Sequence, residues 1–246
     1  MTAPLPPPKV KIKVTGRTRD FVIALDRGIF FFVRHWLAFF NLFVFIFVGL
    51  PFLAPTLMKV GATLPANIIY RMYGPPFCHQ LAYRSWFLFG ERPNYPRDEF
   101  QQYTGIETSV TTARSLLEAR DFTGNEPMGY KVAYCQRDIA IYGFILIGGL
   151  IYSVPLVRQR LKPLHWLAWG LIGIAPIALD GFTQLFSQAL QLGALLPFRE
   201  STPFLRTLTG GLFGLANMWL AYPYFEESMK EVARELGEKL AKVEPH

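Results

Sequence analysis

Two cysteines and the residues beside them are the first groups whose types and spacing could do chemistry. Cys135 and Asp138 stand three apart, so a helix at that position would carry both on one face. Cys78 is followed by His79, and thiolate, imidazole and carboxylate groups are common ligands of zinc and iron. A metal site at Cys78, His79 and Cys135 is therefore one interpretation. Against it, adjacent Cys and His side chains rarely reach one ion, and the sequence has no paired CxxC spacing.

The same cysteines allow three other interpretations. A disulfide between Cys78 and Cys135 is the one we favour, because an oxidising compartment outside the membrane would permit it. A redox-active thiol pair would need a lowered thiol pKa, which nearby arginines and a helix N-terminus can supply. Two unbonded cysteines are the last interpretation. We accordingly expect no bound cofactor, with zinc or iron as the alternative.

Arginines and acidic residues make a second chemical set. Guanidinium groups hold phosphate oxygens through paired hydrogen bonds, which predicts an anionic ligand, above all a lipid phosphate. The residues expected to bind it are Arg84, Arg137, Gln184, Arg199, Glu200 and Arg206. Asp138 and Asp180 are expected to act as a general base or a proton relay. The alternative for the whole set is structural, with the charged side chains forming ion pairs that lock helix ends.

Several enzyme classes lack their sequence signatures here. The chain has no Walker motif, no G-x-G-x-x-G opening a helix after a strand, and no H-E-x-x-H. Ser85, Thr183 and Ser201 lack the context of a nucleophile elbow. Nucleotide-binding folds, zinc proteases and serine hydrolases can be set aside.

The elements that must position these residues are membrane helices. Of the 246 residues 51% are hydrophobic, with a mean hydropathy of +0.23, and the apolar residues are clustered. This composition predicts an all-α, multi-pass integral membrane protein. The formal charge of +7 fits basic cytoplasmic loops, so we expect no nucleic-acid partner. The basic N-terminus leads into an apolar stretch longer than a signal peptide core, which predicts a retained anchor.

Four spans and three other segments follow from the hydropathy pattern. The predicted spans are residues 29–50, 138–157, 166–186 and 207–222. The other segments are a basic cytosolic arm at 1–28, an outer interfacial and polar segment at 53–131, and a cytosolic amphipathic helix at 224–246. Pro51 and Pro55 are expected to break the first helix, and Leu53–Tyr73 to form an interfacial helix, with a further span as the alternative. Within the polar segment we expect a helix near Ser109–Ala119.

Charge bias orients the spans in the inner (cytoplasmic) membrane. Arg158, Arg160 and Lys162 crowd one short turn, and short basic loops stay in the cytoplasm. Both termini are then cytoplasmic, and the polar segment faces out. This topology gathers the candidate residues from separate parts of the chain at the outer face. Ionisable groups near hydrocarbon are costly unless paired or wetted, so the sequence predicts a hydrated outer pocket.

Four sequence blocks resemble a known family. They are C-H-Q-L-A-Y-R-S-W-F-L-F-G (78–90), M-G-Y-K-V-A-Y-C-Q-R-D-I-A-I-Y (128–142), P-I-A-L-D-G-F-T-Q-L-F (176–186) and R-E-S-T-P-F-L-R-T-L-T-G (199–210). In this order they resemble a family of small prokaryotic membrane proteins of unknown function. The resemblance implies no activity, but its blocks contain the residues that the topology gathers. Similar proteins often have a further cysteine where this chain has Asp138, a departure that weakens a thiolate-rich metal site.

The leading hypothesis is an outward-facing pocket that binds, and modifies or moves, an anionic lipid or lipid-linked molecule. Membrane lipid is then the expected partner. One alternative is an accessory subunit of a membrane complex, or a homo-oligomer, held by the Cys78–Cys135 disulfide. The other is a metal- or thiol-dependent membrane oxidoreductase.

Overall fold

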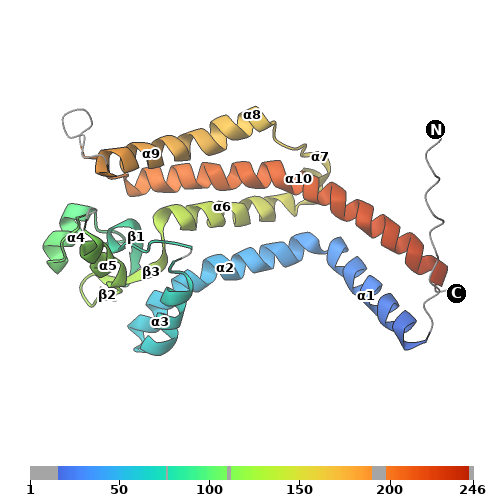
Figure 1. Ribbon diagram of the computed structural model, residues 1–246, viewed down its shortest axis with the longest axis horizontal. Coiled ribbons are helices and arrows are strands. Elements are labelled where there is room, and N and C mark those ends of the chain that lie inside the picture. The colour runs from blue at the N-terminus through green and yellow to red at the C-terminus, as the bar shows by residue number, and fades with distance from the viewer. Residues whose placement is uncertain (1–15, 76, 110–111, 190–197, 244–246) are drawn as a thin grey trace, which may run out of the picture. The chain divides into compact units, whose positions relative to one another are not determined.

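The computed structural model describes residues 16–75, 77–109, 112–189 and 198–243 (Figure 1). The chain divides into a larger unit, Leu37–Phe225, and a smaller one made of the residues up to Trp36 and those from Glu226 onward. Most described residues are helical, so the predicted all-α class is confirmed in its main features.

Helices make up most of the larger unit. They are α2 (Trp36–Lys59), α6 (Gln136–Tyr152), α8 (Trp166–Trp169), α9 (Ala175–Ala189) and α10 (Pro203–Val243), with a π-helical turn η2 (Gly170–Ile174) between α8 and α9 and a short helix α7 (Pro155–Arg160) after α6. Asn41 near the start of α2 donates to Ser153 just after α6 at 3.1 Å, so α2 and α6 are antiparallel. Figure 1 shows α6 and α10 beginning at the end where α2 and α9 finish.

Two helical stretches in the described part of the chain are long and apolar enough to cross a membrane. They are Trp36–Lys59 and Trp166–Gln188. Only 28% and 11% of their most apolar windows are buried, so most of these apolar residues face outward, as lipid-contacting residues do. A soluble protein rarely exposes so much contiguous apolar surface. The integral-membrane prediction gains support, while the crossing of the other two predicted spans stays a prediction.

The first predicted span differs from the helix in the structure. Helix α1 (Arg17–Arg34) ends at His35, whose backbone N–H donates to Phe31 and Phe32, and α2 then runs to Lys59. Pro51 and Pro55 lie inside α2 instead of ending it. Membrane helices tolerate proline because neighbouring groups satisfy the freed carbonyls. The chain then forms α3 (Thr63–Met72), whose ten residues extend about 15 Å, too short to span a membrane.

The polar segment contains a small sheet that the sequence analysis did not predict. Its elements are η1 (Ala82–Arg84), β1 (Ser85–Leu88), α4 (Arg97–Thr104), α5 (Ala113–Asp121), β2 (Gly124–Asn125) and β3 (Gly129–Cys135). The strands are antiparallel in the order β1-β3-β2, and aromatic side chains including Phe87, Tyr95 and Phe100 fill the core beneath them. The expected helix near Ser109–Ala119 corresponds to α5. Because β3 leads directly into α6, the sheet fixes where that helix begins.

The smaller unit pairs α1 with the last part of α10. Lys239 forms an ion pair with Asp26 at 2.7 Å, and Trp36 Nε1 donates to Glu226 at 2.9 Å. Of the predicted basic arm, residues 1–15 lie outside the described residues, and the rest is helical from Arg17. The predicted C-terminal helix is not separate, because α10 continues through Pro223.

Candidate functional site

A polar site lies at the end of the larger unit where the chain leaves the small sheet. It is built from the starts of α6 and α10, the last turns of α9, and the segment that runs from Cys78 into β1. Helix starts carry unpaired N–H groups and helix ends carry unpaired carbonyls. The region where these helices begin and end is therefore polar even without its charged side chains. Two carboxylates organise it.

Glu200 is the centre of the first group. Arg84 approaches it as a fork, with Nε at 2.8 Å from Oε1 and Nη2 at 3.1 Å from Oε2. Arg206, which is buried, pairs with the same carboxylate. Gln184 and Gln188 of α9 donate to it at 3.2 and 2.7 Å. Glu200 therefore joins η1, α9 and α10 in one network.

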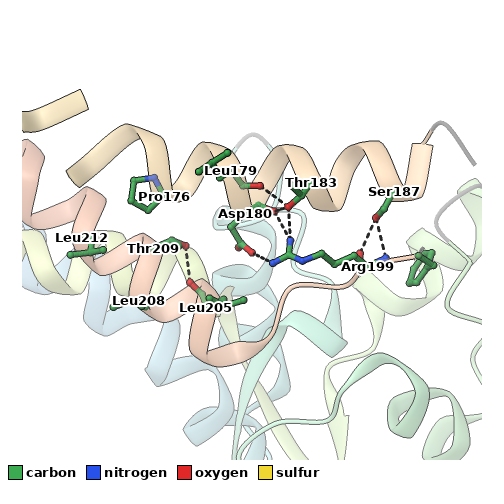
Figure 2. Close-up of a pocket in the computed structure, with 11 residues that line it drawn as sticks. Pro176, Leu179, Asp180, Thr183, Ser187, Arg199, Leu205, Leu208, Thr209 and Leu212 are labelled. Atoms are coloured by element: carbon green, nitrogen blue, oxygen red, sulfur yellow. Dashed lines mark hydrogen bonds and ion pairs between the residues drawn. The ribbon is translucent and has the colours of Figure 1, made fainter. Parts of the chain in front are cut away.

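Asp180 is the centre of the second group, which Figure 2 shows in part. Its oxygens accept from Arg137, from Arg199 Nη2 at 2.7 Å and from Ser201 Oγ at 2.6 Å. Arg199 Nη1 also donates to Thr183 Oγ1 at 2.7 Å. A buried carboxylate already engaged by three donors is poorly placed to accept a further proton, so this geometry favours a positioning role for Asp180 over a general base.

The two groups carry an excess of positive charge. Each carboxylate faces two arginines, so four guanidinium groups oppose two carboxylates, a surplus of two. Asp138 reduces it to one. Buried charge is costly unless it is paired, and a site with surplus arginine suits an anion.

A thiol cluster adjoins the arginines. The Sγ atoms of Cys78 and Cys135 and a carboxylate oxygen of Asp138 lie within 4.8 Å of one another. Cys135 Sγ donates to Asp138 Oδ2 at 3.1 Å, while Cys78 Sγ accepts from the backbone N–H groups of Gln80 and Cys135, each at 3.4 Å. The thiols are not bonded to each other. A side-chain hydrogen bond with Cys135 and burial raise the pKa of the Cys78 thiol, which does not favour a reactive thiolate there.

Two cavities in the described part of the chain reach the arginines of the site. One of about 310 Å³ is lined by both cysteines, Asp138 and three arginines, together with other side chains. Its lining residues include Cys78, His79, Arg84, Cys135, Arg137, Asp138, Gln184, Gln188 and Arg206. The other, of about 720 Å³, runs between α9 and the start of α10 (Figure 2). Leucines 179, 205, 208 and 212 and Pro176 form its apolar walls, and Asp180, Thr183, Ser187 and Arg199 its polar part.

Residues 127–220 match the sequence model of a family described as "Predicted membrane protein (DUF2085)". The resemblance to a predicted-membrane-protein family of unknown function is confirmed. An uncharacterised protein of Methanocaldococcus jannaschii is 26% identical over 182 residues, which cover 72% of this chain and 83% of the relative. No solved structure matches the chain. The stretch matched to the family holds both carboxylate centres, whereas Cys78 and Arg84 precede it.

The structure brings the predicted site residues together. Eight of them line the smaller cavity, and Glu200 forms ion pairs with two of these eight, Arg84 and Arg206. Asp180 and Arg199 belong to the larger cavity, and Arg137 links the two by lining one and pairing with Asp180. His79 lines the smaller cavity but lies outside the group of three possible metal ligands.

The sequence did not point to four residues that form hydrogen bonds in or near the site, namely Gln80, Lys131, Gln188 and Ser201. Lys131 is 1% exposed, and its Nζ donates to the carbonyl oxygens of Arg120 and, at 3.0 Å, Gln80. Burial lowers the pKa of its ammonium group to about 7. The only sequence signal was a lysine set among apolar residues in G-Y-K-V-A-Y, where strand alternation could turn it inward.

Proposed function

We propose that this membrane protein binds an anionic lipid, or a lipid-linked molecule carrying a phosphate, at the outer end of its helices. The observation that carries the proposal is the cluster of four arginines around two carboxylates, next to a cavity with leucine walls. A surplus of guanidinium groups attracts a phosphate. Apolar walls extending from Arg199 along α9 and α10 suit an acyl chain.

The carboxylates take a positioning role in this proposal. Asp180 holds Arg137 and Arg199, and Glu200 holds Arg84 and Arg206. Prearranged side chains lose less conformational freedom when a ligand arrives. Asp138 accepts a hydrogen bond from Cys135 and is the acidic group that lines the smaller cavity. In the protein without bound metal it is the candidate base or proton relay, should the ligand be modified as well as bound.

We infer that four helices cross the membrane to place this site at the outer face. The support is directional: α2 and α9 both run toward the site, whereas α6 and α10 run away from it (Figure 1). If α2 and α8–α9 cross in the same direction, the chain must return between them, and α6 lies in that position. The basic turn around Lys162 then falls in the cytoplasm, as positive charge in a short loop favours.

Lipid retention tests the proposal. Protein purified in mild detergent would be titrated with phosphatidylglycerol or phosphatidylcholine and examined by native mass spectrometry. We expect preferential retention of phosphatidylglycerol, weakened about ten- to a hundredfold by Arg199→Gln and largely kept by Arg199→Lys, since losing one charge-assisted hydrogen-bonding group costs about 1.5–3 kcal/mol. Higher salt should weaken the preference.

Arg114→Gln is the matched control. Arg114 lies on α5 and pairs with Glu118, and its side chain is 85% exposed, so its loss should leave lipid retention unchanged. The proposal fails if Arg199→Gln folds, with the melting temperature of the parent protein, and still retains phosphatidylglycerol equally well. An accessory subunit would instead co-purify with a stoichiometric partner and show no lipid preference.

A further inference from the structure

The group formed by Cys78, Cys135 and Asp138 has the composition of a metal site. Two thiols and a carboxylate, drawn from a loop and from the start of α6, have ligand atoms within 4.8 Å of one another. The ligand sulfurs of a tetrahedral zinc ion with 2.3 Å bonds lie roughly 3.8 Å apart. Small side-chain movements would therefore suffice to enclose an ion.

The backbone around Cys78 is arranged for a metal-bound thiolate. Its sulfur accepts two backbone N–H groups, those of Gln80 and Cys135. Gln80 adopts a left-handed conformation with φ of 52°, which is uncommon for a residue other than glycine. Its side chain holds it there by donating to the carbonyls of Tyr70 at 2.9 Å and Ala133 at 2.6 Å. Hydrogen bonds of this kind orient metal ligands and tune them.

The arginines near the two cysteines would compensate the net charge of a zinc site. Two thiolates and a carboxylate around a divalent ion leave one net negative charge. Arg84, Arg137 and Arg206 line the same cavity and offset it.

We propose that Cys78, Cys135 and Asp138 bind one zinc ion whose fourth coordination position faces the cavity of about 310 Å³. Zinc fits sulfur and oxygen ligands in tetrahedral geometry, and three protein ligands leave a position for water or an anionic ligand. The inference does not rest on lipid binding, because metal content is measured without any lipid.

Metal analysis of the purified full-length protein tests it. The protein would be purified without chelator, reduced, loaded with Zn²⁺, freed of excess ion and analysed by elemental mass spectrometry. We expect one zinc per chain, and Co²⁺ in its place should give the charge-transfer absorption of thiolate ligands. Asp138→Asn keeps the shape of the side chain and should lower zinc affinity at least tenfold, with the melting temperature in chelator unchanged.

His79→Ala is the matched control. His79 lines the same cavity outside the group of three, so its variant should keep a full zinc complement, whereas Cys78→Ser and Cys135→Ser should lose it. Three results would overturn the assignment: less than a tenth of an equivalent of zinc in the loaded parent protein, unchanged affinity in Asp138→Asn, or a stoichiometric Cys78–Cys135 disulfide in the protein as isolated.

Discussion

Burial of the Lys131 side chain in the small sheet predicts a pH-dependent stability. Its pKa falls from 10.5 to about 7 in the folded chain because burial disfavours the charged form. Between these two values the unfolded chain binds a proton that the folded chain does not. Stability should therefore rise from about pH 7 toward pH 10, since folding no longer releases that proton once the unfolded chain has lost it as well. Thermal unfolding in detergent at a series of pH values would show this rise.

Lys131→Met separates this effect from other titrations. The methionine fills much of the same volume and cannot ionise, so the melting temperature of the variant should lose most of its rise between pH 7 and pH 10. Lys162→Met, at an exposed position, should keep it. A rise of equal size in Lys131→Met and the parent protein would show that other groups cause it.

The sequence was sufficient to predict which charged residues belong to the polar site, because they lie next to the apolar helices. Asp180, Glu200 and the arginines stand out because charge beside apolar runs is rare. The pairing of Arg84 with Glu200 was not predictable, because the two residues are joined by packing between distant segments. Lys131 was missed for a related reason: its burial depends on a sheet formed by strands far apart in the chain.

At the scale of elements, glycine sets how closely α6 and α10 pack. A Cβ added at Gly214 would lie 2.3 Å from the carbonyl oxygen of Ile141, and one at Gly210 would lie 2.7 Å from that of Arg137. The two helices therefore approach each other closely at these glycines. Since α6 carries Arg137 and Asp138, and α10 carries Arg206, this spacing also sets the geometry of the polar site.

Gly214→Ala should lower the melting temperature by several degrees. The obstacle is backbone rather than a flexible side chain, and overpacking typically costs about 1–3 kcal/mol. Gly143→Ala is the control, because an added Cβ there meets no heavy atom within 4 Å. Thermal unfolding of both variants in the same detergent compares them, and equal melting temperatures would contradict the proposed steric role.

Helix positions were easier to predict than helix boundaries. Each predicted span overlaps a helix in the structure, since long apolar runs are a strong signal. The predicted helix boundaries at Pro51, Pro55 and Pro223 were wrong, because each of these prolines lies inside a helix that continues past it. The small sheet had no clear sequence signal, as β1 has four residues and β2 only two.

At the scale of the whole molecule, the polar segment and the basic turn should lie on opposite sides of the membrane. Helices α2, α6, α8–α9 and α10 alternate in direction along the chain, so the four proposed crossings would leave both termini on the same side. With this topology the site would face the outside, where lipid headgroups and metal ions of that compartment could reach it. A protease recognition sequence inserted after Glu91, an exposed residue, tests this arrangement.

In bacterial spheroplasts, protease added outside should cut the chain carrying the insertion after Glu91 and spare a chain carrying it after Lys162. Disrupting the membrane with detergent should make both insertions cleavable, which controls for local accessibility. Cleavage at both insertions in intact spheroplasts would mean that α6 does not cross, and cleavage after Lys162 alone would mean that the orientation is reversed. In either case the proposed topology would be wrong. The arginines would then not be placed at the outer surface of the membrane, where an outer-leaflet lipid could reach them.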